Sequence, residues 1–186
     1  MGHDKNLIFI EGTNVDLKVL DEKDLLESYW VRWFNSEERC RNNQHHYFPT
    51  NYEIQKKYLA EAISDTKIQL GVIDKFLPGS ICGVISLQQI NLINRNAEMA
   101  IMLDERTKAK PIIFAESWSL LMRHGFEQLG LNKIYSGAIN PEIHKLLNNL
   151  FNFIEEGKLL RHIYKNNEYV DVTLSAVFKE TVKYRA

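Results

Sequence analysis

Cysteine and long apolar runs are scarce in this chain, and each shortage excludes a class of protein. Its 186 residues include two cysteines, Cys40 and Cys82, which lie among apolar residues and without metal-ligand spacing. This excludes a disulfide-rich scaffold and predicts buried thiols in a reducing cytoplasm. No apolar run reaches the length of a membrane span, and none follows Met1 to His3. Neither a membrane span nor a signal peptide is therefore predicted.

An excess of charge of one sign is also absent. Lysine and arginine number 23 against 24 aspartates and glutamates, so the net charge is −1. Such a balance gives no global attraction to nucleic acid or to an anionic membrane, and neither partner is expected. Hydrophobic residues make up 45% of the chain, which suits one globular domain with an ample core. We expect a single domain over residues 1–186, with 1–6 as a disordered or tag-derived tail, in the cytoplasm.

The stretch from Asn94 to Asn140 predicts a strand, a charged turn, a long helix and a second strand. In residues 94–103 apolar side chains recur at every second position, and Glu98 falls on the other face. Pro111 suits the first turn of the helix, and Gly130 suits its end. Because this helix is apolar round much of its circumference, it requires packing on at least two sides. The other elements are expected to surround it.

Periodicity predicts further strands and helices before and after this stretch. A helix is expected from Asp21 through Asn35 because Asp21 can act as its N-cap. Antiparallel strands followed by one strand–helix–strand crossover predict an α+β fold with a mixed, mostly antiparallel sheet. The remaining expected elements are strands at 15–20, 67–73 and 80–91, helices at 51–64 and 141–152, and a closing hairpin of 153–164 with 169–178.

Four local motifs resemble the GCN5-related N-acetyltransferases (GNATs). They are NRNAE at 94–98, ESWSLLMRHGFEQLGLNKI at 116–134, Asn140 after the next strand, and EEGKLLRHIYKNNEYVDV at 155–172. The likeness is greatest to the branch that holds ribosomal-protein acetyltransferases and N-acetyltransferases of nucleotide-linked amino sugars. It implies a three-layer GNAT-like fold whose sheet is splayed between its fourth and fifth strands, with acetyl-CoA in the notch.

The resemblance also implies which residues contact the cofactor. The pantetheine arm is expected to pair with the fourth-strand backbone, and the pyrophosphate to sit on unpaired amides at the start of the long helix. The implied contacts are the backbone of Ile101, Met102 and Leu103, the amides of Ile112 and Ile113, and the side chain of Asn140.

One family motif is missing from the sequence. The family's phosphate loop reads Gln/Arg-x-x-Gly-x-Gly/Ala, but residues 84–124 contain no glycine. Three cations, Arg106, Lys108 and Lys110, are predicted to hold the phosphates by charge instead. The alternative is that they form a solvated turn with no ligand.

Acetyl transfer requires a neutral amine, so the resemblance points to Glu98 as the base. The alternative is a polar residue with no proton role. The family's usual acid is a tyrosine in the helix after Asn140, where this chain has none; Asn148, or with another alignment Leu147, takes its place. A thiolate leaving group has low basicity, so a dedicated acid is dispensable. No histidines and carboxylates have metal-ligand spacing, and no metal is expected.

The segment that covers the acceptor in this family is aromatic and polar here. Its candidate contacts are Trp33, Arg41, His46 and Tyr47, which offer the flat faces and planar polar groups that suit sugars. The predicted acceptor is a small molecule, a nucleotide-linked amino sugar. Two alternatives stay open: a protein N-terminal or ribosomal-protein acetyltransferase, for which Glu37 and Glu38 would contact a basic tail, and a catalytically silent GNAT-fold binding module. A homodimer is also left open.

Overall fold

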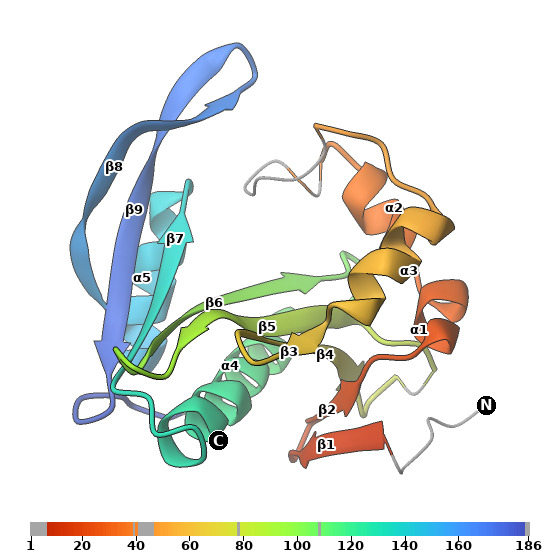
Figure 1. Cartoon of the computed structure of the whole chain (residues 1–186), viewed down its shortest axis with the longest axis horizontal. Coiled ribbons are helices and arrows are strands. Elements are labelled where there is room, and N and C mark those ends of the chain that lie inside the picture. The colour runs from red at the N-terminus through yellow and green to blue at the C-terminus, as the bar shows by residue number, and fades with distance from the viewer. Residues whose placement is uncertain (1–6, 39, 41–46, 78, 108, 185–186) are drawn as a thin grey trace.

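The structure is a computed structural model that describes residues 7–38, 40, 47–77, 79–107 and 109–184. The predictions for Arg41, His46, Lys108 and the tail at 1–6 lie outside these residues. One sheet organises the described chain, in the order β1-β2-β4-β5-β6-β7-β9-β8, with β3 paired to β4 (Figure 1). Among the described strands, β6 and β7 are the one pair that runs in parallel. The predicted α+β fold is therefore confirmed.

The elements follow the predicted order with few exceptions. The strands are β1 (Ile8–Glu11), β2 (Val15–Val19), β3 (Ile63–Ser64), β4 (Lys67–Asp74), β5 (Gly83–Asn91), β6 (Asn96–Leu103), β7 (Lys133–Ala138), β8 (Ile154–Lys165) and β9 (Glu168–Phe178). The helices are α1 (Glu22–Glu27), α2 (Trp30–Asn35), α3 (Tyr52–Ala60), α4 (Lys110–Glu127) and α5 (Pro141–Phe151). Strands β1 and β3 were not expected from the sequence.

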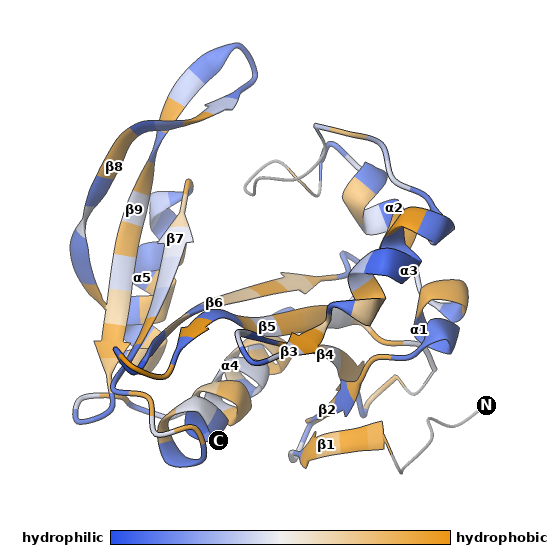
Figure 2. Ribbon diagram, viewed as in Figure 1, coloured by the Kyte–Doolittle hydropathy of each residue, from blue (hydrophilic) through white to orange (hydrophobic). Residues whose placement is uncertain are grey.

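The two faces of the sheet carry different cores. Ala97 and Met99 of β6 are fully buried against α4, as their alternation predicts, together with Trp118 and Phe126 of the helix itself. The opposite face holds a second core around Trp30 and the helices α1 to α3. Figure 2 shows the apolar colour on β5 and at the end of β9, and hydrophilic colour at the far end of the β8–β9 hairpin.

The expected helix from Asp21 through Asn35 is two helices, and this prediction is corrected. Ser28 leaves the helical conformation with ψ at 173°, and its hydroxyl accepts a hydrogen bond from the Trp30 amide at 3.1 Å. A serine side chain that bonds to nearby backbone competes with helix continuation. The break turns α2 so that Trp30 enters the second core.

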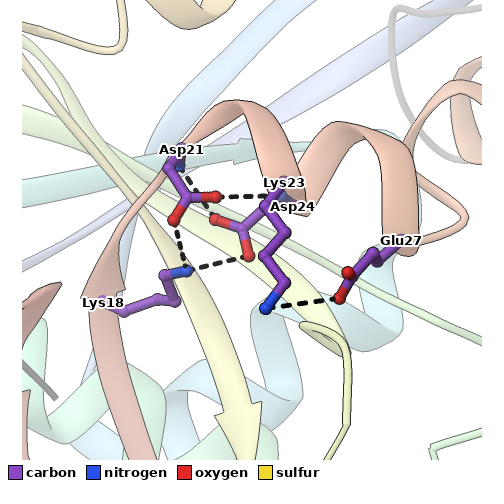
Figure 3. A network of polar contacts seen from close by, with 5 residues as sticks. All are labelled: Lys18, Asp21, Lys23, Asp24 and Glu27. Carbon is purple, nitrogen blue, oxygen red and sulfur yellow. Dashed lines mark hydrogen bonds and ion pairs between the residues drawn. The ribbon is translucent and has the colours of Figure 1, made fainter. Parts of the chain in front are cut away.

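A buried ion network fixes α1 to β2 (Figure 3). Lys18 of β2 is 2% exposed, and its Nζ lies 3.0 Å from Asp24 Oδ1 and 3.2 Å from Asp21 Oδ2. Asp21 and Asp24 also cap the first turn of α1 through each other's backbone amides. Burial raises the pKa of Asp24, while the bonds to Asp21 and Lys18 oppose the rise. The direction in which the chain enters α1 and α2 is thereby set.

A second buried carboxylate ties the β1–β2 turn to the central helix. Glu116 of α4 is 6% exposed and accepts hydrogen bonds from the amides of Thr13 and Asn14 and, at 2.7 Å, from the Asn14 side chain. These hydrogen bonds are partly buried, and Glu116 supplies the acceptor without which the turn amides would lose free energy of bonding. Gly12 is required beside it, since a Cβ there would lie 2.5 Å from Glu116 Oε1.

Glu116→Gln is expected to lower the free energy of unfolding by about 2 kcal/mol. The glutamine carbonyl cannot accept all of these bonds, and its NH₂ group would face the N–H groups of Thr13 and Asn14. Urea denaturation measures the change. Glu127→Gln on the exposed side of the same helix is the matched control and should alter stability little. Equal midpoints for the two variants would contradict the assigned role of Glu116.

Candidate active site

The notch opens where β6 and β7 part. The two strands share three registered pairs, of which Glu98–Tyr135 is the last, while β7 continues beside β9 as far as Ala138. Figure 1 shows the strands diverging from that point. Beyond Glu98, no described strand residue is registered against this edge of β6. Residues 101–103, predicted to pair with pantetheine, lie on the open edge.

The start of α4 differs from the prediction. The amides of Ile112 and Ile113 both donate to the carbonyl of Ala109 at 3.0 Å, so they are not unpaired as expected, and their contact with a pyrophosphate stays a prediction. The first turn closes on its own N-cap carbonyl and uses these donors. Within the described chain, the amides of Ala109 and Lys110 make no hydrogen bond. They lie at the N-terminus of an 18-residue helix, the end at which helices bind anions.

Arg106 is held within the loop that leads from β6 to α4. Its guanidinium bonds to Asp104 at 2.7 Å and lies 3.6 Å from the centre of the Tyr29 ring. Asp104 also accepts from Trp33 Nε1 at 2.9 Å. Burial alone would raise the pKa of Asp104, but the hydrogen bonds from Arg106 and Trp33 hold it well below its ordinary value. About half of the Arg106 side chain stays exposed, so it can still face a phosphate.

Trp33 is corrected as an acceptor contact. Its side chain is 1% exposed and does not line the neighbouring pocket. The ring packs against Trp30 instead, with ring centres 6.5 Å apart. Large aromatic groups buried with a bonded N–H are core anchors rather than ligand platforms.

A pocket of about 730 Å³ lies beside the notch, between α2, α3, residues 47–50 and the face of β4 to β6. Tyr47, a predicted acceptor contact, lines it, as do the amide side chains of Gln55, Gln69 and Gln88. Lys67 is the one charged residue in the described lining. The pocket is therefore aromatic and amide-rich, without a carboxylate among the described lining residues.

Tyr47 links this pocket to the β8–β9 hairpin. Its hydroxyl donates to the Tyr164 carbonyl at 2.7 Å, and Lys165 donates to the carbonyl of Cys40. These contacts join residues more than a hundred positions apart in sequence, and they connect the β8–β9 hairpin to Tyr47 and Cys40. The sequence motif at 155–172 thus contacts a residue of the pocket lining through the Tyr164 carbonyl.

Glu98 lies on the pocket side of β6, opposite the buried face of Ala97 and Met99. It is half-buried, and it accepts a hydrogen bond from Gln89 Nε2 at 2.9 Å. Burial raises the pKa of Glu98, and hydrogen bonds from the side chains of Gln88 and Gln89 partly offset the rise. A carboxylate with a raised pKa beside a pocket has the properties of a general base.

The two asparagines predicted for the site each have a structural partner. Asn140 is the N-cap of α5, and its side chain accepts from the Glu142 amide at 3.0 Å. Asn148 donates from Nδ2 to the Phe153 carbonyl at 2.6 Å and so closes the end of the same helix. Their proposed roles toward cofactor and chemistry stay predictions beside these structural ones.

Register brings together residues that the sequence did not single out. Lys67, Gln88, Glu98 and Tyr135 are directly paired from β4 to β7, so they form one polar row on the pocket face of the sheet. Alternation alone places each on a face of its strand but does not say which residue of the next strand lies opposite. Only Glu98 was predicted.

Among the described residues, no group of three or more His, Cys, Asp or Glu side chains is arranged to hold a metal ion. None of the helices described combines the length and the apolar character needed to cross a bilayer.

Comparison with known proteins adds relatives and structural neighbours, although no family model matches the chain. Over 102 residues it is 31% identical to "Putative ribosomal N-acetyltransferase YdaF" of Bacillus subtilis, a match that covers 54% of this chain and only 55% of that relative. The spermidine N-acetyltransferase of Vibrio cholerae, solved with CoA and spermine, has a TM-score of 0.78 at 22% identity and covers 91% of this chain and 98% of its own.

A mutant form of the V. cholerae spermidine/spermine N-acetyltransferase SpeG gives a TM-score of 0.72 at 24% identity, covering 91% of this chain and 96% of its own. At this level of identity the likeness shows the fold. The resemblance to the GNAT acetyltransferases inferred from the sequence is confirmed, and so is the splayed, mostly antiparallel sheet that it implied.

Proposed function

Because the chain has the GNAT fold, we propose that it transfers an acetyl group from acetyl-CoA to the primary amine of a small molecule. One observation carries the proposal: the open edge of β6, the start of α4 and the half-buried Glu98 adjoin one notch, with a pocket beside it. Each feature meets one requirement of the reaction. These are backbone for the cofactor arm, donors for its phosphates, a base, and room for an acceptor.

The residues present fit the cofactor without the family's glycines. Peptide groups of residues 101–103 at an unpaired strand edge suit the amides of a pantetheine arm. The amides of Ala109 and Lys110, the helix dipole and the Lys110 charge suit a pyrophosphate. Arg106 stands at the same turn, half exposed. Acetyl-CoA supplies a thioester, whose carbonyl carbon accepts the amine.

Glu98 is proposed to take the proton from the acceptor amine, directly or through one water. An amine is mostly protonated near neutral pH, so the site must remove that proton before the nitrogen can attack. Burial brings the pKa of Glu98 up toward the working pH, which makes it a better matched base. The thiol that departs is acidic enough to leave as thiolate, so Asn148 need not act as an acid.

The lining of the pocket favours an amino sugar linked to a nucleotide as acceptor. Aromatic faces and amide groups suit a sugar ring and its hydroxyls, and Lys67 offers a cation for a phosphate. The structural neighbours act on spermidine, a polycation, but the described lining holds no carboxylate to receive one. Within this pocket Tyr47 is the aromatic candidate that replaces Trp33.

A second candidate is acetylation of a ribosomal protein. The relative from B. subtilis is named for that activity, and Glu37 and Glu38 are exposed after α2, where a basic tail would find carboxylates. The two candidates share the cofactor site and the base. They differ in whether the acceptor enters the pocket or lies across its rim.

Acetyl-CoA or CoA is expected to bind in calorimetry, and Lys110→Ala is expected to weaken binding about fivefold, since one partly screened cation contributes roughly 1 kcal/mol. Lys179→Ala, an exposed lysine after β9, is the control and should leave the affinity unchanged. Absence of binding by either ligand at millimolar concentration would favour the catalytically silent module.

Glu98→Gln is expected to lower kcat by at least about a hundredfold while leaving acetyl-CoA affinity intact. Only the ionised carboxylate accepts a proton, and its pKa is raised above the usual 4.5, so wild-type kcat should fall as pH descends through that raised value. The variant should lack this acid limb. An unchanged kcat from pH 6 to 9 would leave Glu98 with a structural role.

An acetylation assay that offers UDP- or dTDP-linked amino sugars, spermidine and basic N-terminal peptides tests the acceptor. We expect turnover of a nucleotide sugar, and an increase of about tenfold in its KM in Lys67→Ala with little change in kcat, because a remote phosphate contact is made equally in ground and transition states. Lys57→Ala on the exposed side of α3 is the control. Turnover of spermidine or peptides alone would contradict the nucleotide sugar.

A further inference from the structure

A β-bulge in β5 lies directly beside Glu98. Gln88 is registered against Glu98, but the next registered pair is Asn91–Asn96, so the strand carries an irregularity between them. Within it Gln89 has φ at +52°, a left-handed conformation that a residue with a side chain rarely adopts. Such backbone persists where the surrounding structure holds it, and it is concentrated at functional sites.

The bulge changes where the side chain of Gln89 points. In a regular strand successive side chains alternate, so Gln88 and Gln89 would lie on opposite faces. Here the Gln89 amide reaches the carboxylate of Glu98, since Gln89 Nε2 lies 2.9 Å from Glu98 Oε2, while Gln88 is registered directly against Glu98. On its other side, Gln89 Oε1 lies 3.4 Å from the hydroxyl of Tyr135.

The directions of these bonds are fixed by chemistry. An ionised carboxylate only accepts, so the NH₂ of Gln89 must face Glu98 and its carbonyl must face Tyr135, whose hydroxyl then donates. The chain of donors runs from Tyr135 through Gln89 to Glu98 and ends on the negative charge. Protonated Glu98 could accept this bond only through an uncharged carbonyl oxygen, which is a weaker acceptor than the carboxylate, so the arrangement favours the ionised base.

We propose that Gln89 is a positioning residue, placed by the β-bulge to orient the Glu98 carboxylate and keep it ionised, with Tyr135 fixing the orientation of the Gln89 amide. This inference rests on the proposed role of Glu98 as base. Gln89 acts through Glu98, and no contact with the acceptor is assigned to it.

Other charged groups around this row do not replace Gln89. Lys133 lies 5.9 Å from the centre of the Tyr135 ring, and its ammonium is paired with Glu156 at 2.6 Å. Lys67 stands at the far end of the row, separated from Glu98 by Gln88. Tyr135 keeps its proton, because burial and then the charge of Glu98 raise its pKa.

The test compares Gln89→Met, which keeps side-chain length without the amide, and Gln89→Gly, which also relieves the left-handed backbone. Arg95→Gly is the matched control for strain relief, since Arg95 has φ at +53° in the same β5–β6 hairpin. The Glu98 carboxyl is titrated by NMR in the free protein, and the pH profile of kcat is measured beside the affinity for acetyl-CoA.

In both Gln89 variants we expect the Glu98 pKa to rise by up to about one unit, because a hydrogen bond to the charged form is lost. The acid limb of kcat should move to higher pH by the same amount, with acetyl-CoA affinity unchanged. Tyr135→Phe should give a smaller shift in the same direction, and Arg95→Gly none.

Two results separate this inference from the proposed function. If acetyl transfer occurs but the Glu98 titration and the kcat profile are the same in the Gln89 variants as in the wild type, the positioning role is overturned and the function stands. If no acetyl transfer is found, the NMR titration still decides whether Gln89 holds Glu98 in its ionised form. A shift in Arg95→Gly equal to that in Gln89→Gly would assign the effect to strain and overturn the proposal.

Discussion

The short parallel pairing between β6 and β7 is the constraint on which the candidate site depends. Each strand is held firmly on its outer side, β6 by β5 and β7 by β9, but the two share only three registered pairs. Each strand of a sheet is rotated relative to its neighbour. Three registered pairs do not hold β6 and β7 side by side along their whole length, so the strands separate beyond Glu98. An unpaired strand edge of this kind can pair with another chain and lead to aggregation. In the proposed function this edge of β6 pairs with the pantetheine arm of acetyl-CoA.

Buried carboxylates fix the loops around that notch. Glu116, Asp104 and Asp24 each lie in the interior and accept bonds from groups that would otherwise be buried without partners. A buried charge with several donors is directional in a way that apolar packing is not. The turn before β2, the loop before α4 and the start of α1 are thereby set relative to the sheet. The start of α4 in particular follows a loop that Asp104 holds through Arg106 and Trp33.

The sequence predicted what depends on local pattern and missed what depends on register. Alternation placed Glu98 opposite Ala97 and Met99, and proline and glycine marked the ends of α4, because each signal involves neighbours in the chain. The closure of the first turn on Ala109, the break at Ser28 and the burial of Trp33 depend on side chains and backbone that meet only in the fold. Gln89 is the clearest example of what the sequence could not predict. Alternation places its side chain on the face opposite Glu98, but the β-bulge turns it toward Glu98.

In the proposed function, the charges that line the pocket affect both which acceptor binds and the pKa of Glu98. A polycation such as spermidine would be bound by carboxylates, but each carboxylate added near Glu98 would raise its pKa further by repulsion and leave less of the base ionised. The described lining instead offers amides and one lysine, which sits in the same cross-strand row as Glu98. In the proposed function, a lining with one cation and no carboxylate among the described residues favours an acceptor of neutral or negative charge, and it leaves Glu98 available to accept the proton. The same fold with carboxylates at Gln69 or Gln88 would need a different way to hold its base in the ionised form.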